Sequence, residues 1–271
     1  MTKWLVRIHG HKFDLQELSD RFNSVEVNVT KDDNDYYYLG SSDFDALLEP
    51  EDIRSRAIEL LACINGIAKV CSKQYEPVKI TKRLFDGDRD VGASFENPYE
   101  EDARTLEMLV QVNEEGTREY VVRASGTVRK QASALPPTPG SSQVTHQQYD
   151  EAKAWYALAS GDRKVEDALY FFHEETTWWT LRKVYEIIED DFGQPNKMEK
   201  HGWADENLIK SFKASANDPR LSGRAAVHAP TARHLQRPWF YDPIPLSEAE
   251  DVIRNIIRNW LQWKLKNGSS L

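Results

Sequence analysis

The stretch Gln131-Ala-Ser-Ala-Leu-Pro-Pro-Thr-Pro-Gly-Ser-Ser142 decides the fold class of this chain, because the hydrophobic period changes across it. It combines Pro, Gly and Ser without periodicity, a composition typical of an exposed, semi-extended linker. Before it, apolar residues follow the patterns of short strands and two helices; after it, they recur at the helical period. The sequence therefore predicts an α+β protein: a mixed α/β domain with a mostly antiparallel sheet at residues 1–130, a linker at 131–147 and an all-α helical bundle at 148–271.

The tryptophans support this division. Seven of the eight follow the linker, and Trp4 alone precedes it. Because Trp is usually a core residue, we expect two different cores, one on each side of the linker.

Strand patterns and turn signals alternate in the first 130 residues. The valines at 25, 27 and 29 alternate with polar residues, and Tyr36–Leu39 follows a turn-like run of Asp and Asn, which together indicate a hairpin. The remaining strands are expected at Trp4–Ile8, Val78–Leu84, Leu106–Val112 and Glu119–Val128.

Two helices are expected among these strands. Asp14 and Glu17 have the spacing of a capping box at the start of a short helix. Pro50 opens the second helix, whose apolar residues form one stripe before Gly66 ends it.

After the linker, the helical period predicts a bundle of four or five helices. Ser247 and Glu250 form a Ser-x-x-Glu capping box ahead of the apolar stripe of the last helix, and Gly268 follows as a stop. A break near Thr176–Thr177 divides the second helix. The helices before the last one are expected at Asp150–Leu158, Val165–Phe192 and Trp203–Phe212.

Composition favours a globular protein in the cytoplasm. The net charge of -9 argues against a chain that coats nucleic acid by bulk electrostatics. No apolar run approaches the roughly 20 residues needed to cross a bilayer, and the charges in Met1–His9 are unlike a signal peptide. Cys63 and Cys71 form no CxxC, so reduced thiols are expected rather than a disulfide or a zinc site.

A local basic patch interrupts this acidic chain. Lys213–Arg237 holds five basic residues and one acid. Within it, Arg224 and His228 lie one helical turn apart if the segment is helical. An Arg that holds a phosphate and a His that moves a proton near neutral pH suffice for metal-independent attack on RNA. The candidates for phosphate or RNA binding around the pair are Asn217, Arg220, Ser222, Arg233 and Arg237.

Other interpretations of this segment stay open. A basic patch of this size is more often a solvated surface or a contact with a partner. Aromatic residues beside such a patch can stack nucleobases, and Trp239–Tyr241 next to Arg237 is the best local candidate. Tryptophans at helical spacing are more often core residues. If Trp239–Tyr241 prove exposed, a surface that binds protein or nucleic acid becomes the better explanation.

No motif for a metal or a cofactor satisfies its spacing rule. Asp86–Gly92 places acids at alternate positions like a calcium loop, but Val91 stands where glycine is required and Asn97 stands at the twelfth position. His9 and His11 share one side of a strand without a third ligand at readable spacing. The sequence has no P-loop, GxGxxG or GxSxG motif. We therefore expect neither a metal nor a cofactor.

The helical half resembles the HEPN domains of bacterial toxin, abortive-infection and CRISPR-associated proteins. The shared pattern is a long helix with an acid near its end, a helix bearing Arg and His, a loop, and a helix beginning Ser-x-x-Glu. Those domains are helical bundles that often dimerise with their Arg-x4-6-His motifs facing across the interface, and many are RNases. The matching residues here are Glu186 or Glu189, Asn217, Arg224, His228 and Leu246–Ile253.

The resemblance implies a bacterial cytoplasmic interaction or regulatory module in a phage-defence or toxin–antitoxin system, with a protein partner or a second copy bound and RNA as a further partner. The alternative is a metal-independent RNase, with His228 as the acid–base group and Arg224 as the phosphate clamp. Three residues separate Arg224 from His228 where the family motif has four to six. This difference favours the binding module.

Overall fold

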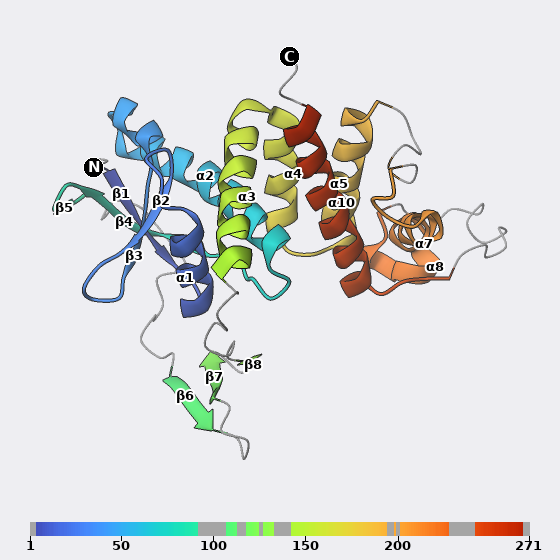
Figure 1. Cartoon of the computed structure of the whole chain (residues 1–271), viewed down its shortest axis with the longest axis horizontal. Helices are drawn as coiled ribbons and strands as arrows, with labels where there is room; N and C mark the ends of the chain where they lie inside the picture. Colours follow the sequence, from blue (N-terminus) through green and yellow to red (C-terminus); the bar gives the residue numbers. More distant parts are fainter. Residues whose placement is uncertain are drawn as a thin grey trace.

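The computed structural model describes residues 4–91, 107–112, 118–124, 127–132, 142–193, 198, 201–227 and 242–267, with 107–132 and 142–150 described by their backbone alone. A five-stranded antiparallel sheet and its helices come first, and a set of packed helices follows (Figure 1). The predicted α+β fold class is confirmed.

The sheet has the strand order β2-β3-β1-β4-β5, and every neighbouring pair is antiparallel. Central strand β1 pairs with both β3 and β4, so that Val6 lies opposite Leu39 on one side and Leu84 on the other. Alternate residues of β1 point into the core, as the period of a strand requires. The strands are β1 Trp4–His9, β2 Asn28–Lys31, β3 Tyr37–Gly40, β4 Lys79–Asp86 and β5 Arg89–Asp90.

A second, three-stranded antiparallel sheet has the order β6-β7-β8. Its strands are β6 Glu107–Val112, β7 Arg118–Ala124 and β8 Thr127–Ala132. The single strand predicted at Glu119–Val128 is therefore wrong, because β7 and β8 form a hairpin within it. Strand β8 ends at Ala132 and the next helix begins at Ser142, both within the stretch 131–147 that the sequence predicts as a linker.

Helix α1, Lys12–Arg21, starts before the predicted cap. Its N-cap is His11, and Asp14 lies in the first turn, where it is buried. The Asp14 carboxylate accepts the backbone N–H of Glu76 at 3.3 Å, and Glu17 pairs with Arg21 at 2.9 Å. These two acids serve contacts within the fold, so the capping box predicted for them is wrong.

Helix α2, Pro50–Cys71, runs from the sheet side into the bundle and passes through Gly66 without interruption (Figure 1). The prediction that Gly66 ends it is wrong. A Cβ atom at position 66 would lie 2.4 Å from the carbonyl oxygen of Leu169. Glycine is present because helix α4 crosses α2 at this point.

The helical part follows the predicted order with shifted bounds. The break expected near Thr176–Thr177 is confirmed: Thr177 caps α5 in a reciprocal capping box with Thr180. The third predicted helix begins later than Trp203, because Asp205 caps it through the N–H groups of residues 207 and 208. The helices are α3 Ser142–Gly161, α4 Arg163–His173, α5 Trp178–Asp191, α7 Glu206–Asn217, α8 Pro219–Ser222 and α10 Leu246–Asn267.

Helix α10 begins one residue before the predicted cap. The Ala249 N–H donates to the carbonyl of Pro245, so Ser247 is already inside the helix. The Glu250 carboxylate accepts from Arg254 at 2.7 Å and lies 3.7 Å from Lys69. Contacts between elements, rather than a capping box, engage this acid.

The buried side chains form one continuous cluster that extends from β1 to α10. The expectation of two cores is therefore wrong, because α2 packs against β4 on one side and against α3, α4 and α10 on the other. The domain bounds stay a prediction. Among the described residues, no helix is long and apolar enough to cross a membrane.

Candidate functional site

Two basic residues of the patch Lys213–Arg237 are neutralised by acids. On α7, the Lys213 ammonium lies 3.0 Å from a carboxylate oxygen of Glu189, and Arg220 on α8 pairs with Asp218. Arg224 is exposed on the short 3-10 helix Gly223–Ala225. The described part of the segment therefore presents fewer free cations than its sequence indicates.

Arg224 does not lie on a continuous helix. The 3-10 helix ends at Ala225, and Ala226 is extended, with φ -60° and ψ 143°. Arg224 and His228 would share one helical face only if the segment between them were helical. As far as residue 227 it is not. His228, Arg233, Arg237 and Trp239–Tyr241 lie outside the described residues. The catalytic pair and its RNA-binding neighbours stay a prediction.

Asn217 and Ser222 belong to the turn that joins α7 to α8. The Ser222 hydroxyl donates to the backbone carbonyl of Ser215, and the Asn217 Oδ1 atom is buried without a hydrogen-bond partner. Of the two acids matched to the HEPN pattern, Glu189 accepts from Tyr185 at 3.1 Å as well as from Lys213, whereas Glu186 pairs with Arg182. The contact with Lys213 thus places Glu189 against α7, at a point four residues before Asn217.

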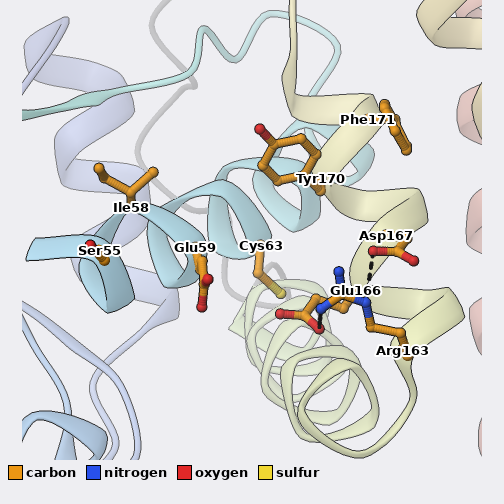
Figure 2. A pocket seen from close by; sticks show the side chains of 9 residues that line it. All are labelled: Ser55, Ile58, Glu59, Cys63, Arg163, Glu166, Asp167, Tyr170 and Phe171. Atoms are coloured by element: carbon orange, nitrogen blue, oxygen red, sulfur yellow. Dashed lines mark hydrogen bonds and ion pairs between the residues drawn. The ribbon is translucent and has the colours of Figure 1, made fainter. Parts of the chain in front are cut away.

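A pocket of about 460 Å³ lies between α2 and α4, far along the chain from the predicted segment (Figure 2). It lies beside the crossing of α2 and α4, where a Cβ atom on Gly66 would lie 2.4 Å from the Leu169 carbonyl oxygen. Because skewed helices separate on either side of their point of contact, this crossing leaves a hollow next to it. Ile58 from α2 and Tyr170 from α4 stand on its walls, and Cys63 forms its floor.

The Cys63 thiol gives the pocket an apolar floor. Burial, followed by the nearby Glu166 charge, raises the pKa of Cys63 to about 12. The thiol therefore stays protonated at neutral pH and is not a nucleophile.

Two exposed apolar side chains, Ile58 and Tyr170, line the pocket, and Trp179 lies against its lining residue Phe171. Ile58 is 47% exposed, Tyr170 41% and Trp179 48%. Phe171 connects the two aromatic residues, since its ring centroid lies 5.7 Å from that of Tyr170 and 5.7 Å from that of Trp179. We call these four residues the aromatic patch.

Three carboxylates, from Glu59, Glu166 and Asp167, and the Arg163 guanidinium line the pocket, so its rim is acidic; Arg56 and Asp43 lie next to Glu59 outside the lining. Arg163 bridges Glu166 at 3.1 Å and Asp167 at 3.0 Å on α4. On α2, Arg56 pairs with Glu59 at 3.1 Å and also reaches Asp43 at 2.7 Å. Two arginines thus neutralise only part of the charge of four carboxylates.

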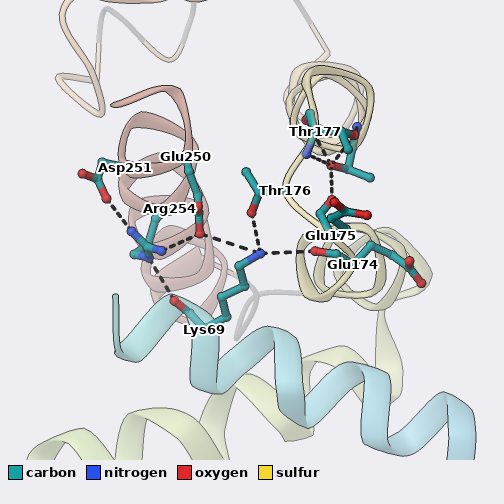
Figure 3. Close-up of polar contacts among 9 residues, drawn as sticks. Lys69, Glu174, Glu175, Thr176, Thr177, Glu250, Asp251 and Arg254 are labelled. Atoms are coloured by element: carbon teal, nitrogen blue, oxygen red, sulfur yellow. Dashed lines mark hydrogen bonds and ion pairs between the residues drawn. The ribbon is translucent and has the colours of Figure 1, made fainter. Parts of the chain in front are cut away.

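A second cleft, of about 750 Å³, lies between the start of β4 and the α4–α5 connection. Lys69 of α2 lines this cleft, and Figure 3 shows its polar contacts. The Lys69 ammonium donates to the Thr176 hydroxyl at 2.9 Å and to the Glu174 carbonyl at 3.2 Å, and it lies 3.7 Å from the Glu250 carboxylate. These contacts join α2, the α4–α5 connection and α10.

The Lys69 cluster is a structural connection. Burial lowers the pKa of Lys69, while the Glu250 charge opposes that shift. Its ammonium already has two hydrogen-bond acceptors and one carboxylate beside it, so little of its donor capacity remains for a ligand. Sequence reasoning missed this cluster. The available signal was a lysine between apolar residues, Ala68 and Val70, both of which are buried in the structure.

Comparisons with protein-family models, curated proteins and solved structures gave no match. The interpretation of the aromatic patch therefore rests on its geometry. Within the described ranges, no group of three or more His, Cys, Asp or Glu side chains is placed to hold a metal ion.

Proposed function

We propose that this chain is a protein-interaction module that binds its partner through the aromatic patch. The observation that carries the proposal is the exposure of Ile58 and Tyr170 at one pocket and of Trp179 next to it, with Phe171 in ring contact with both aromatic side chains. Contiguous exposed apolar surface with a polar rim is typical of interaction sites.

The patch contains the residue types that dominate binding energy at interfaces. Trp and Tyr are enriched among hot spots because they cover a large area at low entropic cost. Covering the exposed half of Trp179 removes about 100 Å² from water. At about 25 cal/mol per Å², this burial contributes about 2 to 3 kcal/mol. Trp179 alone is thus worth more than a tenfold change in affinity.

The setting we propose follows from the resemblance to HEPN domains. A helical module of that kind acts as a regulatory or assembly component of a bacterial phage-defence or toxin–antitoxin system. The RNase alternative needs His228 and finds no support among the described residues.

Co-purification tests the interaction function. Trp179→Ser and Tyr170→Ser remove apolar surface from the patch. We expect each to reduce the amount of a specific co-purifying protein about tenfold or more, since a loss of about 1.4 kcal/mol already weakens binding tenfold. The measurement is quantitative mass spectrometry of proteins captured with the tagged chain from the cells that produce it.

Leu48→Ser is the matched control for this experiment. Leu48 is apolar and 85% exposed, but it lies outside the patch. The control is expected to retain the partner. Retention of the same partner by Trp179→Ser and Tyr170→Ser, or its equal loss with Leu48→Ser, contradicts the proposed function.

A further inference from the structure

We infer that the partner presents a basic amphipathic helix to the aromatic patch, an inference that rests on the interaction function proposed above. The inference rests on two independent features of the pocket: the negative charge of its rim and its shape.

The charge of the rim selects a cationic partner. Three carboxylates line the pocket, from Glu59, Glu166 and Asp167, together with the Arg163 guanidinium that pairs with two of them. Glu59 pairs with Arg56, which Asp43 also engages outside the lining. The side chain of Glu59 is 59% exposed and that of Asp167 is 38% exposed, so both can accept further hydrogen bonds from solvent or a partner. Complementary charge around an apolar centre both steers association and sets specificity.

The shape of the hollow suits a helix. The pocket lies beside two crossing helices, with walls from α2 and α4 and an apolar floor at Cys63. Its volume of about 460 Å³ accommodates one or two large apolar side chains. An amphipathic helix that inserts such anchors at i and i+3 or i+4 into a groove is a recurring mode of recognition. Lys or Arg residues flanking those anchors then reach Glu59 and Asp167.

A second copy of the chain and a nucleic acid both fit this surface less well. A symmetric dimer brings each patch against itself, so the acidic rim would face an identical acidic rim, and like charges in contact are unfavourable. The phosphates of a nucleic acid would meet the same carboxylates. Charge therefore favours a basic protein segment over these occupants.

Binding of model peptides tests the inference. The probe is a fluorescein-labelled peptide of about 18 residues with an amphipathic Leu/Lys pattern. Its counterpart keeps every leucine and replaces each Lys with Glu. Fluorescence anisotropy with the full chain is expected to give affinity at least tenfold higher for the Lys peptide than for the Glu peptide, with the difference shrinking as salt is added.

Variants locate the binding site. Glu59→Gln together with Asp167→Asn is expected to weaken binding of the Lys peptide about fivefold, the ratio that two exposed ion pairs of about 0.5 kcal/mol each give. Asp33→Asn together with Glu248→Gln removes the same formal charge from exposed residues that do not line the pocket, and it is expected to change affinity less than twofold. Trp179→Ser is expected to weaken binding about tenfold or more.

Each other outcome overturns the inference in a distinguishable way. Equal binding of the Lys and Glu peptides, both lost in Trp179→Ser, removes the basic partner and leaves the interaction function intact. Binding of the Lys peptide that is unchanged in Trp179→Ser shows attraction to the acidic chain elsewhere. Absence of peptide binding, while partner capture still depends on Trp179, excludes a basic helix. A dimer in sedimentation velocity that Trp179→Ser disrupts assigns the patch to a second copy.

Discussion

Gly66 is the residue whose role differs most from the one expected of it. A glycine in a helical pattern is a common stop signal, and the sequence alone gives no view of the helix that crosses it. The carbonyl oxygen of Leu169 lies within 2.4 Å of the position that a Cβ atom would take. Gly66 thus sets the distance between α2 and α4, and with it the pocket beside their crossing.

Gly66→Ala is therefore expected to destabilise the protein, although alanine is the better helix former by about 1 kcal/mol. The added methyl group must push the two helices apart, and overpacking of this kind costs about 1 to 3 kcal/mol. Urea unfolding followed by circular dichroism measures the change. Gly161→Ala at the end of α3 is the control, since nothing lies within 4 Å of its Cβ position. A variant at position 66 as stable as that control contradicts the close crossing.

Lys69 makes a prediction about pH. Burial lowers its pKa from the ordinary value near 10.5, so the folded state binds fewer protons than the unfolded state between the lowered and the ordinary pKa. The free energy of unfolding then rises with pH across that window. We therefore expect the unfolding free energy of the wild type minus that of Lys69→Met to become more positive as pH is raised toward 10.5.

Urea unfolding at a series of pH values measures this difference, and the subtraction cancels the groups that the two proteins share. If the wild-type value minus the variant value stays constant or becomes more negative toward pH 10.5, the lowered pKa of Lys69 is contradicted.

Trp179 shows how far single residues can be predicted. Trp178 and Trp179 are adjacent, and consecutive residues of a helix point about 100° apart, so both cannot lie at the centre of one narrow buried stripe. The pattern was therefore sufficient to expect one of them near the surface. It was not sufficient to place Trp179 against Phe171, because that contact depends on how α4 and α5 pack.

At the scale of the helix, α10 supplies hydrogen bonds that the end of α2 lacks. The last carbonyls of a helix have no partner within it and carry partial negative charge. The Arg254 guanidinium donates to the Lys69 carbonyl at 2.9 Å, and Arg258 donates to the Val70 carbonyl at 2.8 Å. The two arginines join the end of α2 to α10.

Arg258→Ala is expected to lower the free energy of unfolding by about 1 to 2 kcal/mol, because it leaves a partly buried carbonyl without a charged donor. Arg258→Lys should recover part of the loss by keeping the positive charge. Thermal and urea unfolding measure both variants. Lys266→Ala, an exposed substitution on the same helix, serves as the control. Equal effects of Arg258→Ala and Lys266→Ala contradict the capping role.

Sequence patterns predict the existence of elements better than their ends. The helical period and the break before Thr177 were confirmed, because they follow from local chemistry. The ends at Asp14, Gly66 and Ser247 were wrong. At Asp14 and Gly66 the decisive contact comes from a residue distant in the sequence, Glu76 and Leu169 respectively. At Ser247 the helix already begins with the preceding residues, since the Ala249 N–H donates to the Pro245 carbonyl.

At the scale of the whole molecule, α2 makes one core out of two expected ones. Every residue from Leu60 to Val70 is buried, which is the pattern of a helix surrounded on all sides. Only one apolar stripe of this helix entered the prediction. The nearly continuous apolar run Leu60–Val70 in the sequence could have indicated that α2 lies between the sheet and the bundle rather than on the surface of one of them.

The same arrangement explains why the candidate site escaped sequence reasoning. The aromatic patch draws on α2, before the Pro/Gly/Ser stretch, and on α4 and α5, after it. Its residues form no motif with a fixed spacing, since their proximity depends on the packing of three helices. The basic segment had a motif-like spacing, but its described basic residues, Lys213, Arg220 and Arg224, pair with acids or lie on a 3-10 helix.

Site-specific photo-crosslinking tests the docking role of the aromatic patch most directly. A photoreactive phenylalanine analogue is placed at Tyr170 or, in a second protein, at Leu48, and each is irradiated in the cells that produce the chain. The account predicts one discrete covalent adduct with a protein at position 170 and none at position 48. No adduct at position 170, or the same set of adducts at both positions, would contradict it.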